Sequence, residues 1–163
     1  MSSAPEIGEL WTGRAAEVVE LGAGLDVWDF HAKGYFVVIT TNRRLRSDGT
    51  AVMGAGLAKQ AAERYPDLPR RYGCCLAEGR DRMSFPAYRL LLAPTKDDWR
   101  LPAVPSLVSE LFTAVAQWCL AHPDGAAVLA APGCGQGGLE WAEVRDEARR
   151  GLRGCRAVLL PPR

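Results

Sequence analysis

The chain has 163 residues, of which 48% are hydrophobic and 24% charged, and its formal net charge is +1. That length allows one domain with a sizeable core and is short for two, so we expect a single domain over residues 1–163. The near-zero charge excludes broad electrostatic capture of nucleic acid or of an anionic membrane. The apolar runs also stay well below the ~18 residues that a membrane-spanning helix needs.

The cysteines and the first ten residues indicate the cellular compartment in which we expect the chain. Five cysteines, odd in number and irregular in spacing, argue against a disulfide framework and for a reducing environment. Two histidines and no C-x-x-C pair give no pattern for a structural zinc site. Residues 1–10 lack a basic start followed by an apolar stretch, so no secretory leader is predicted. We expect a cytoplasmic domain that needs neither a metal nor a cofactor.

The first half of the chain predicts two strands and a helix. The run EVVEL at 17–21 alternates between apolar and polar residues, which is typical of an edge strand. The run YFVVITT at 35–41 is continuous, which indicates a strand that is covered on both faces. Small and apolar residues then recur at helical spacing in GAGLAKQAAERY, residues 54–65.

The second half continues the same alternation of strand and helix. Continuous apolar runs at 88–93, 126–131 and 157–160 predict three more buried strands. Helical periodicity fills 105–121 and 140–152 between them. The order predicts a three-layer α/β fold, with helices on both faces of one sheet.

Two glycine-rich segments, 54–56 and 133–138, each follow a predicted strand and precede a predicted helix. A turn at that place directs backbone N–H groups and a helix N-terminus outward, which suits a phosphate group. Glycine allows the close approach and the positive φ that such a turn uses. The alternative is a tight turn that binds nothing.

The common nucleotide motifs are absent or out of place. Gly133, Gly135 and Gly138 fit the G-x-G-x-x-G spacing, but a dinucleotide fold needs that motif in an early βαβ unit with an acidic residue about twenty positions later. That position is Val158, in the last predicted strand, so a hydride-transfer enzyme is disfavoured. No G-x-x-x-x-G-K-[ST] occurs. The basic run NRRLR at 42–46 is interpreted as a solvated loop.

Four segments occur in an order and spacing that resemble a macrodomain: VITTN (38–42), VMGAGLA (52–58), APTKDDWR (93–100) and PGCGQGGLEW (132–141). The likeness extends over residues 17–160 and is greatest to the branch that holds the terminal ADP-ribose protein glycohydrolase and the DNA ADP-ribosyl glycohydrolase antitoxins. It implies a mixed sheet between helices, with ADP-ribose in a cleft at the strand ends.

The resemblance also implies roles for particular residues. The adenine-binding aspartate matches Asp26 in LDVW, with Asp29 as the second choice and a turn or helix cap as the structural alternative. Asn42 matches the asparagine that faces the distal ribose, or it is a simple loop residue. The ADP-ribose-binding set implied by the motifs is Asp26, Val27, Asn42, Met53, Gly54, Ala55, Gly56, Thr95, Gly133, Cys134, Gly135, Gln136, Gly137, Gly138 and Leu139. Asn42 and, second to it, Gln136 are the candidate catalytic residues.

Several neighbours of these motifs keep an alternative interpretation. Lys96 either lines the cleft or pairs in solvent with Asp97 or Asp98. Trp99 and Trp141 are interpreted as packing residues rather than as chemical groups. Cys134 is likewise interpreted as a packing residue, because no histidine can be assigned as its base.

The chain departs from the branch at two positions. The helix lysine that acts at the anomeric carbon in the family falls on Ala62, and the later aspartate of the glycohydrolase falls on Gly137. Lys59 lies three residues before Ala62, about 60° around the helix and ~4.5 Å along it, so it is not a direct substitute.

These observations favour a slow hydrolase that removes mono-ADP-ribose from acidic residues of proteins. The bond to a carboxylate leaving group is labile, and positioning the ribose and a water can suffice. The alternative is a reader that binds ADP-ribose without turnover. The expected partners are ADP-ribose and an ADP-ribosylated protein or nucleic acid, and no membrane.

Overall fold

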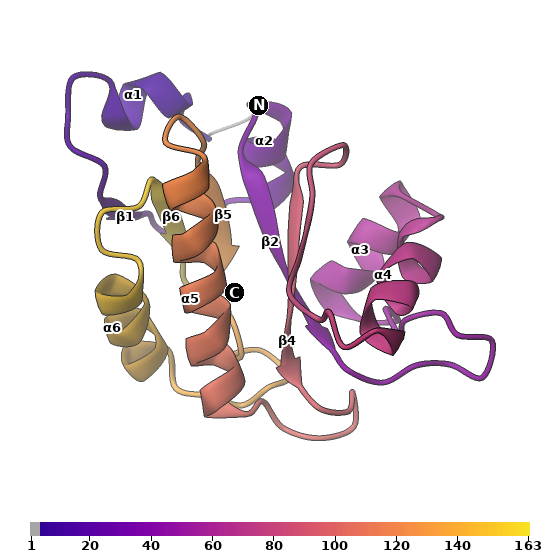
Figure 1. Cartoon of the computed structure of the whole chain (residues 1–163). Coiled ribbons are helices and arrows are strands. Elements are labelled where there is room, and N and C mark those ends of the chain that lie inside the picture. Colours follow the sequence, from indigo (N-terminus) through magenta and orange to yellow (C-terminus); the bar gives the residue numbers. More distant parts are fainter. Residues whose placement is uncertain (1–3) are drawn as a thin grey trace.

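The computed structural model describes residues 4–163 and contains one six-stranded sheet between two layers of helices (Figure 1). The strands are β1 (Val18–Glu20), β2 (Phe36–Asn42), β3 (Met83–Phe85), β4 (Leu90–Lys96), β5 (Ala127–Ala130) and β6 (Ala157–Leu160). Their order across the sheet is β1-β6-β5-β2-β4-β3. All neighbours pair in parallel except β3, which pairs antiparallel with β4. The mixed sheet and the edge position of β1 are as predicted.

Six helices connect and cover the strands. They are α1 (Ile7–Trp11), α2 (Val27–Ala32), α3 (Gly56–Arg64), α4 (Leu68–Ala77), α5 (Pro105–Ala121) and α6 (Trp141–Gly151). Helices α5 and α6 lie on one side of the sheet, and α2, α3 and α4 lie on the other (Figure 1). The predicted three-layer arrangement is confirmed.

Alternate residues of each inner strand enter opposite cores. In β2, Val37 and Ile39 pack with α2 and α4, whereas Val38 packs with α5. In β5, Val128 packs in the core on the α2–α4 side of the sheet, and Leu129 packs in the core on the α5–α6 side. A strand that is buried on both faces has no polar side to present, which explains the continuous apolar runs in the sequence.

Most boundaries differ from prediction by one to three residues, and two of these differences have a clear local cause. Residues 88–93 were expected as a strand, but β4 starts at Leu90 because Tyr88 and Arg89 form the turn from β3, with Arg89 at φ 52°. The helix expected from residue 54 starts at Gly56, because Ala55 is extended. Helices α1, α2 and α4 and strand β3 were not predicted; each is short, with no long periodic pattern.

The parallel strands all end at the same edge of the sheet, where the loops after β2, β4 and β5 gather (bottom of Figure 1). Ligands of open α/β sheets bind outside this edge. Among the helices of residues 4–163, none is long and apolar enough to cross a membrane. The prediction that residues 1–10 contain no secretory leader includes residues 1–3, which lie outside the described residues.

Candidate functional site

A cleft of about 1140 Å³ opens at the carboxyl ends of the parallel strands. Its walls come from six segments of the chain: the turn 22–27 after β1, the end of β2 with the loop that follows it, the start of α3, the end of β4, the loop after β5 and the segment after β6. This volume slightly exceeds the usual range for small-ligand sites. The predicted residues that line it are Asp26, Val27, Asn42, Gly54, Ala55, Gly56, Thr95, Gly133, Gly135, Gln136 and Gly137.

The first glycine loop, 54–56, presents its backbone to the cleft without steric constraint from the protein. Gly56 has φ +56°, and a Cβ at this position would meet nothing within 4 Å. A Cβ on Gly54 would find only the Arg46 guanidinium at 3.8 Å. Within residues 4–163, the N–H groups of Gly54, Ala55 and Gly56 donate to no protein acceptor. Three adjacent donors at a helix start are therefore available to an anion.

The second loop, 133–138, is held by the protein itself. A Cβ on Gly137 would lie 2.4 Å from the Gly133 carbonyl oxygen and 2.8 Å from Ala103 Cβ. The Gly137 carbonyl also accepts the Ala103 N–H at 3.0 Å. Gly135 is different, since a Cβ there would meet nothing. Over the described chain, the N–H groups of residues 135–137 have no protein acceptor, so this loop also offers three donors.

Asp26 lies at the first turn of α2 and is exposed in the cleft wall. Its Oδ1 accepts the Trp28 backbone N–H at 3.0 Å, so the side chain caps the helix. No second hydrogen bond engages Oδ2 within residues 4–163, and this oxygen remains an acceptor. Asp29, the second choice from the sequence, lies inside α2 and does not line the cleft.

Asn42 is the last residue of β2 and is only 8% exposed. Its Nδ2 donates to the Val52 carbonyl at 3.1 Å, and its Oδ1 accepts the Arg44 N–H at 2.9 Å. The side chain therefore holds the loop after β2 in place. One N–H and one oxygen lone pair remain for a ligand, since an amide has two donors and two acceptor sites.

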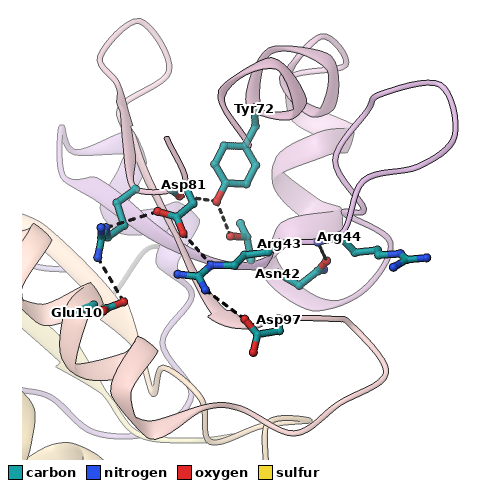
Figure 2. A network of polar contacts seen from close by, with 9 residues as sticks. Asn42, Arg43, Arg44, Tyr72, Asp81, Asp97 and Glu110 are labelled. Carbon is teal, nitrogen blue, oxygen red and sulfur yellow. Dashed lines mark hydrogen bonds and ion pairs between the residues drawn. The ribbon is translucent and has the colours of Figure 1, made fainter. Parts of the chain in front are cut away.

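A buried polar network fixes the strand end next to this asparagine (Figure 2). The hydroxyl of Tyr72, a fully buried residue of α4, donates to the Asp81 carbonyl at 2.6 Å and lies 2.8 Å from Thr41 Oγ1. Arg43 then bridges the carboxylates of Asp81 (2.8 Å) and Asp97 (3.2 Å). Burial raises the pKa of Tyr72, so its hydroxyl stays protonated and donating at neutral pH.

Positive charge is concentrated in the cleft, although the whole chain is nearly neutral. Of the described lining residues, one is anionic, Asp26, and five are cationic: Arg44, Arg46, Lys96, Arg100 and Arg163. The basic run 42–46 was interpreted as a solvated loop, but its second and third arginines line the cleft. Arg44 and Arg100 both pair with Asp98. The remaining cations, Arg46, Lys96 and Arg163, still exceed the single anion, which suits a ligand with two phosphates.

The aspartates after β4 pair with arginines rather than with Lys96. Asp97 binds Arg43, and Asp98 accepts two hydrogen bonds from the Arg100 guanidinium at 2.9 and 2.7 Å. Those bonds hold the pKa of the Asp98 carboxyl well below its usual range. Lys96 remains at the cleft wall without an ion pair among residues 4–163.

Four residues of the predicted binding set do not line the cleft: Met53, Cys134, Gly138 and Leu139. Met53 is buried in the core on the α2–α4 side, whereas Cys134 and Leu139 pack toward α5 and α6. The Gly138 N–H closes the loop on the Gly135 carbonyl at 3.2 Å. Burial, with a contribution from Glu140, raises the pKa of the Cys134 thiol, so it stays neutral.

Two positions on α3 were compared with the lysine of the family, Ala62 and Lys59, and neither side chain lines the cleft. Ala62 is half-buried and packs on the core. Lys59 is 59% exposed, lies 3.9 Å from Glu63 in an ion pair, and is absent from the cleft wall. Among the described residues of α3, no lysine lines the cleft. The described residues also contain no group of three or more His, Cys, Asp or Glu that could hold a metal.

The structure adds wall residues that sequence reasoning missed. Gln60 of α3 lines the cleft, as do the turn 22–25 and the segment 161–163. The exposed Trp99, which was expected to pack in the core or in the cleft wall, also lines it. Arg163 reaches back across the cleft end, where its Nη2 donates to the Leu25 carbonyl at 3.1 Å. The glycines of the 22–25 turn were a usable signal, because they also follow a strand. Nothing in the sequence pattern marks Gln60.

Solved structures share this architecture. The macrodomain of Mycobacterium tuberculosis DarG matches with a TM-score of 0.73 at 22% identity, over 91% of this chain and 99% of that chain. The macrodomain of Thermus aquaticus DarG matches with 0.69 at 23%, over the same shares. Thermosipho africanus DarTG in complex with ADP-ribose matches with 0.70 at 19%, over 88% of this chain and 42% of that chain. No family model and no curated protein matches.

The chain therefore has the macrodomain fold. Two of the similar solved structures, at TM-scores of 0.73 and 0.69, are DarG macrodomains, as the sequence motifs indicated. At this level of identity the likeness defines the architecture, and the function depends on the site.

Proposed function

We propose that the cleft binds ADP-ribose. The observation that carries this proposal is the pair of glycine loops in the cleft wall, each with three adjacent N–H groups that no acceptor within residues 4–163 uses. The cationic wall adds charge that matches a diphosphate. A structural neighbour, DarTG of Thermosipho africanus, was solved in complex with ADP-ribose.

In the proposed orientation the diphosphate lies between loops 54–56 and 133–138. The adenine lies toward Asp26, whose free oxygen accepts a hydrogen bond from the exocyclic amine. The distal ribose then lies beside Asn42 and Gln136, where the remaining N–H of Asn42 can contact a hydroxyl. This arrangement assigns a ligand contact to the free N–H groups of both loops, to the free oxygen of Asp26 and to the remaining N–H of Asn42.

We further propose that the domain hydrolyses the ester between ADP-ribose and a carboxylate of a protein. The carboxylate is a good leaving group, and the transition state resembles an oxocarbenium ion. Asn42 positions the ribose and a water, and the cationic wall stabilises the departing charge. Water attacks the anomeric carbon, the bond to the carboxylate oxygen breaks, and the proton of water ends on the released acid.

The test is a release assay with a protein that carries mono-ADP-ribose on glutamate, with free ADP-ribose measured by chromatography. The wild-type domain should release ADP-ribose. Asn42→Ala should slow release at least about tenfold, which corresponds to ~1.4 kcal/mol of transition-state stabilisation. Lys59→Ala is the matched control and should leave the rate unchanged, since its side chain does not line the cleft.

Melting temperatures of both variants separate a lost contact from a loosened loop, because Asn42 also holds the segment after β2. A large effect of Lys59→Ala would contradict the proposed mechanism, in which no lysine acts. Binding of ADP-ribose in calorimetry without any release would instead support the second function, a reader. The engagement of the Asn42 amide in the fold and the absence of a lysine on the α3 wall favour that alternative.

A further inference from the structure

One tryptophan holds two side chains of the cleft wall from two different helices. The backbone N–H of Trp28 donates to Asp26 Oδ1 at 3.0 Å, and its indole N–H donates to Gln60 Oε1 at 2.6 Å. Asp26 lies at the start of α2 and Gln60 lies on α3, yet both line the same cleft. Trp28 therefore holds both of these cleft-wall side chains by hydrogen bonds.

The chemistry of the indole fixes which way the Gln60 amide points. An indole N–H donates and cannot accept, so the atom facing it must be the amide oxygen. The amide nitrogen, with its two N–H groups, is then turned away from Trp28. Neither this nitrogen nor Asp26 Oδ2 has a hydrogen-bond partner within residues 4–163.

Trp28 is itself held firmly. The residue is 7% exposed, the guanidinium of Arg64 lies 4.0 Å above its ring centroid, and the His31 ring meets it edge-on with centroids 5.4 Å apart. A tryptophan packed on both sides has little freedom to change rotamer. The two side chains that it supports are consequently presented in a fixed arrangement before any ligand arrives.

A fixed acceptor beside a fixed donor selects one kind of purine. Adenine carries its exocyclic amine, a donor, next to a ring nitrogen that accepts. Hypoxanthine and guanine carry a carbonyl oxygen in place of that amine, which would face the Asp26 carboxylate and be repelled. Asp26 and Gln60 are both exposed, so the mismatched base is disfavoured by this repulsion and by the lost hydrogen bonds.

We infer that Gln60 is a base-selecting residue of the cleft, which acts with Asp26 to accept adenine and reject 6-oxopurines. The inference rests on the proposed binding of ADP-ribose and adds a second contact to the base. Gln60 donates to a ring nitrogen of adenine while Asp26 accepts from the amine. Trp28 is a positioning residue, since it holds both groups and touches no ligand itself.

The experiment compares two ligands that differ only in the base: ADP-ribose and its hypoxanthine analogue, inosine diphosphate ribose. Calorimetry gives both affinities for the wild type, which should prefer ADP-ribose at least about tenfold. Gln60→Glu keeps an oxygen for the Trp28 indole but replaces the donor with an acceptor. It should reduce the preference to about threefold or less. The ratio of affinities is the readout because any repulsion of the diphosphate by the new charge affects both ligands equally.

Gln117→Glu is the matched control, because Gln117 is exposed on α5 and does not line the cleft. It should leave the ratio unchanged. Trp28→Phe keeps an aromatic ring under Arg64 but removes the indole N–H, so the amide is free to rotate and the ratio should fall partway. This variant supplies a second test that does not depend on the fold of Gln60→Glu.

The outcomes separate the two proposals. If the wild type binds neither ligand, the proposed function is wrong. If it binds ADP-ribose with the expected preference, and folded Gln60→Glu and Trp28→Phe keep that preference, the base-selecting role is wrong while the proposed function stands. A wild type that binds both ligands equally also overturns the base-selecting role.

Discussion

The two glycine loops of the cleft have similar sequences and different physical reasons for their glycines. In loop 54–56, Gly56 is needed for its positive φ, and the space around both glycines is open. In loop 133–138, Gly137 is needed because backbone and Ala103 leave no room for a Cβ, whereas Gly135 faces open space. Internal packing therefore explains some of the glycines in these loops, and the approach of a ligand is needed to explain only the others.

The largest expected effect comes from Gly137→Ala. The added methyl group would lie 2.4 Å from the Gly133 carbonyl oxygen, a backbone atom that cannot turn aside as a side chain would. We expect a loss of about 2–3 kcal/mol in the free energy of unfolding, the cost typical of overpacking. Urea denaturation with the wild type measured in parallel checks this value. Equal free energies of unfolding for variant and wild type would show that the second loop accommodates an added Cβ as easily as the first.

Gly56→Ala should have an intermediate effect through the backbone alone. A residue with a Cβ at φ +56° costs about 1 kcal/mol even where there is space for it. Gly54→Ala is the matched control in the same loop, since its φ is not positive and its nearest new contact is an ordinary 3.8 Å. The same denaturation experiment should place Gly54→Ala within about 0.5 kcal/mol of wild type. A stronger effect at Gly54 than at Gly56 would refute the backbone explanation.

Gly135→Ala should have the smallest effect on folding and a clear effect on binding. A Cβ here meets nothing within 4 Å, so the free energy of unfolding should change by less than about 0.5 kcal/mol. If the diphosphate contacts this loop as proposed, the methyl group lies between ligand and N–H, and affinity for ADP-ribose should fall about tenfold or more. Calorimetry measures the affinity. Unchanged binding would mean that the phosphates do not approach residue 135.

Much of the fold was predictable, because the inner strands are buried on both faces and leave uninterrupted apolar runs. The bounds of α5, Pro105–Ala121, and of β6, Ala157–Leu160, were predicted as the structure has them. The prediction of secondary structure fails where tertiary contacts decide which element forms. Helix α4 carries Gly73, whose missing side chain admits the loop carbonyl of Gly49, and no local pattern announces such a contact.

The site was predictable where motifs lie in single short segments and unpredictable where segments converge. Asn42, which the resemblance implied, and the loop glycines other than Gly138 were expected in the site, and they line the cleft. Gln60 and Arg163 were not, because their positions follow from the packing of α3 on α2 and from the return of the last segment over Leu25. Such neighbours are 32 and 138 residues apart in sequence, beyond the reach of any periodicity.

The contact between Arg163 and the turn at Leu25 has a practical consequence for anyone who produces this domain. Pro161, Pro162 and Arg163 form part of the cleft rim, so an affinity tag or fusion partner joined after Arg163 would emerge directly at the mouth. A flexible peptide there would occupy the same space as the proposed ligand and would lower the apparent affinity in a titration. Purification handles belong at the other terminus, or must be cleaved before titration.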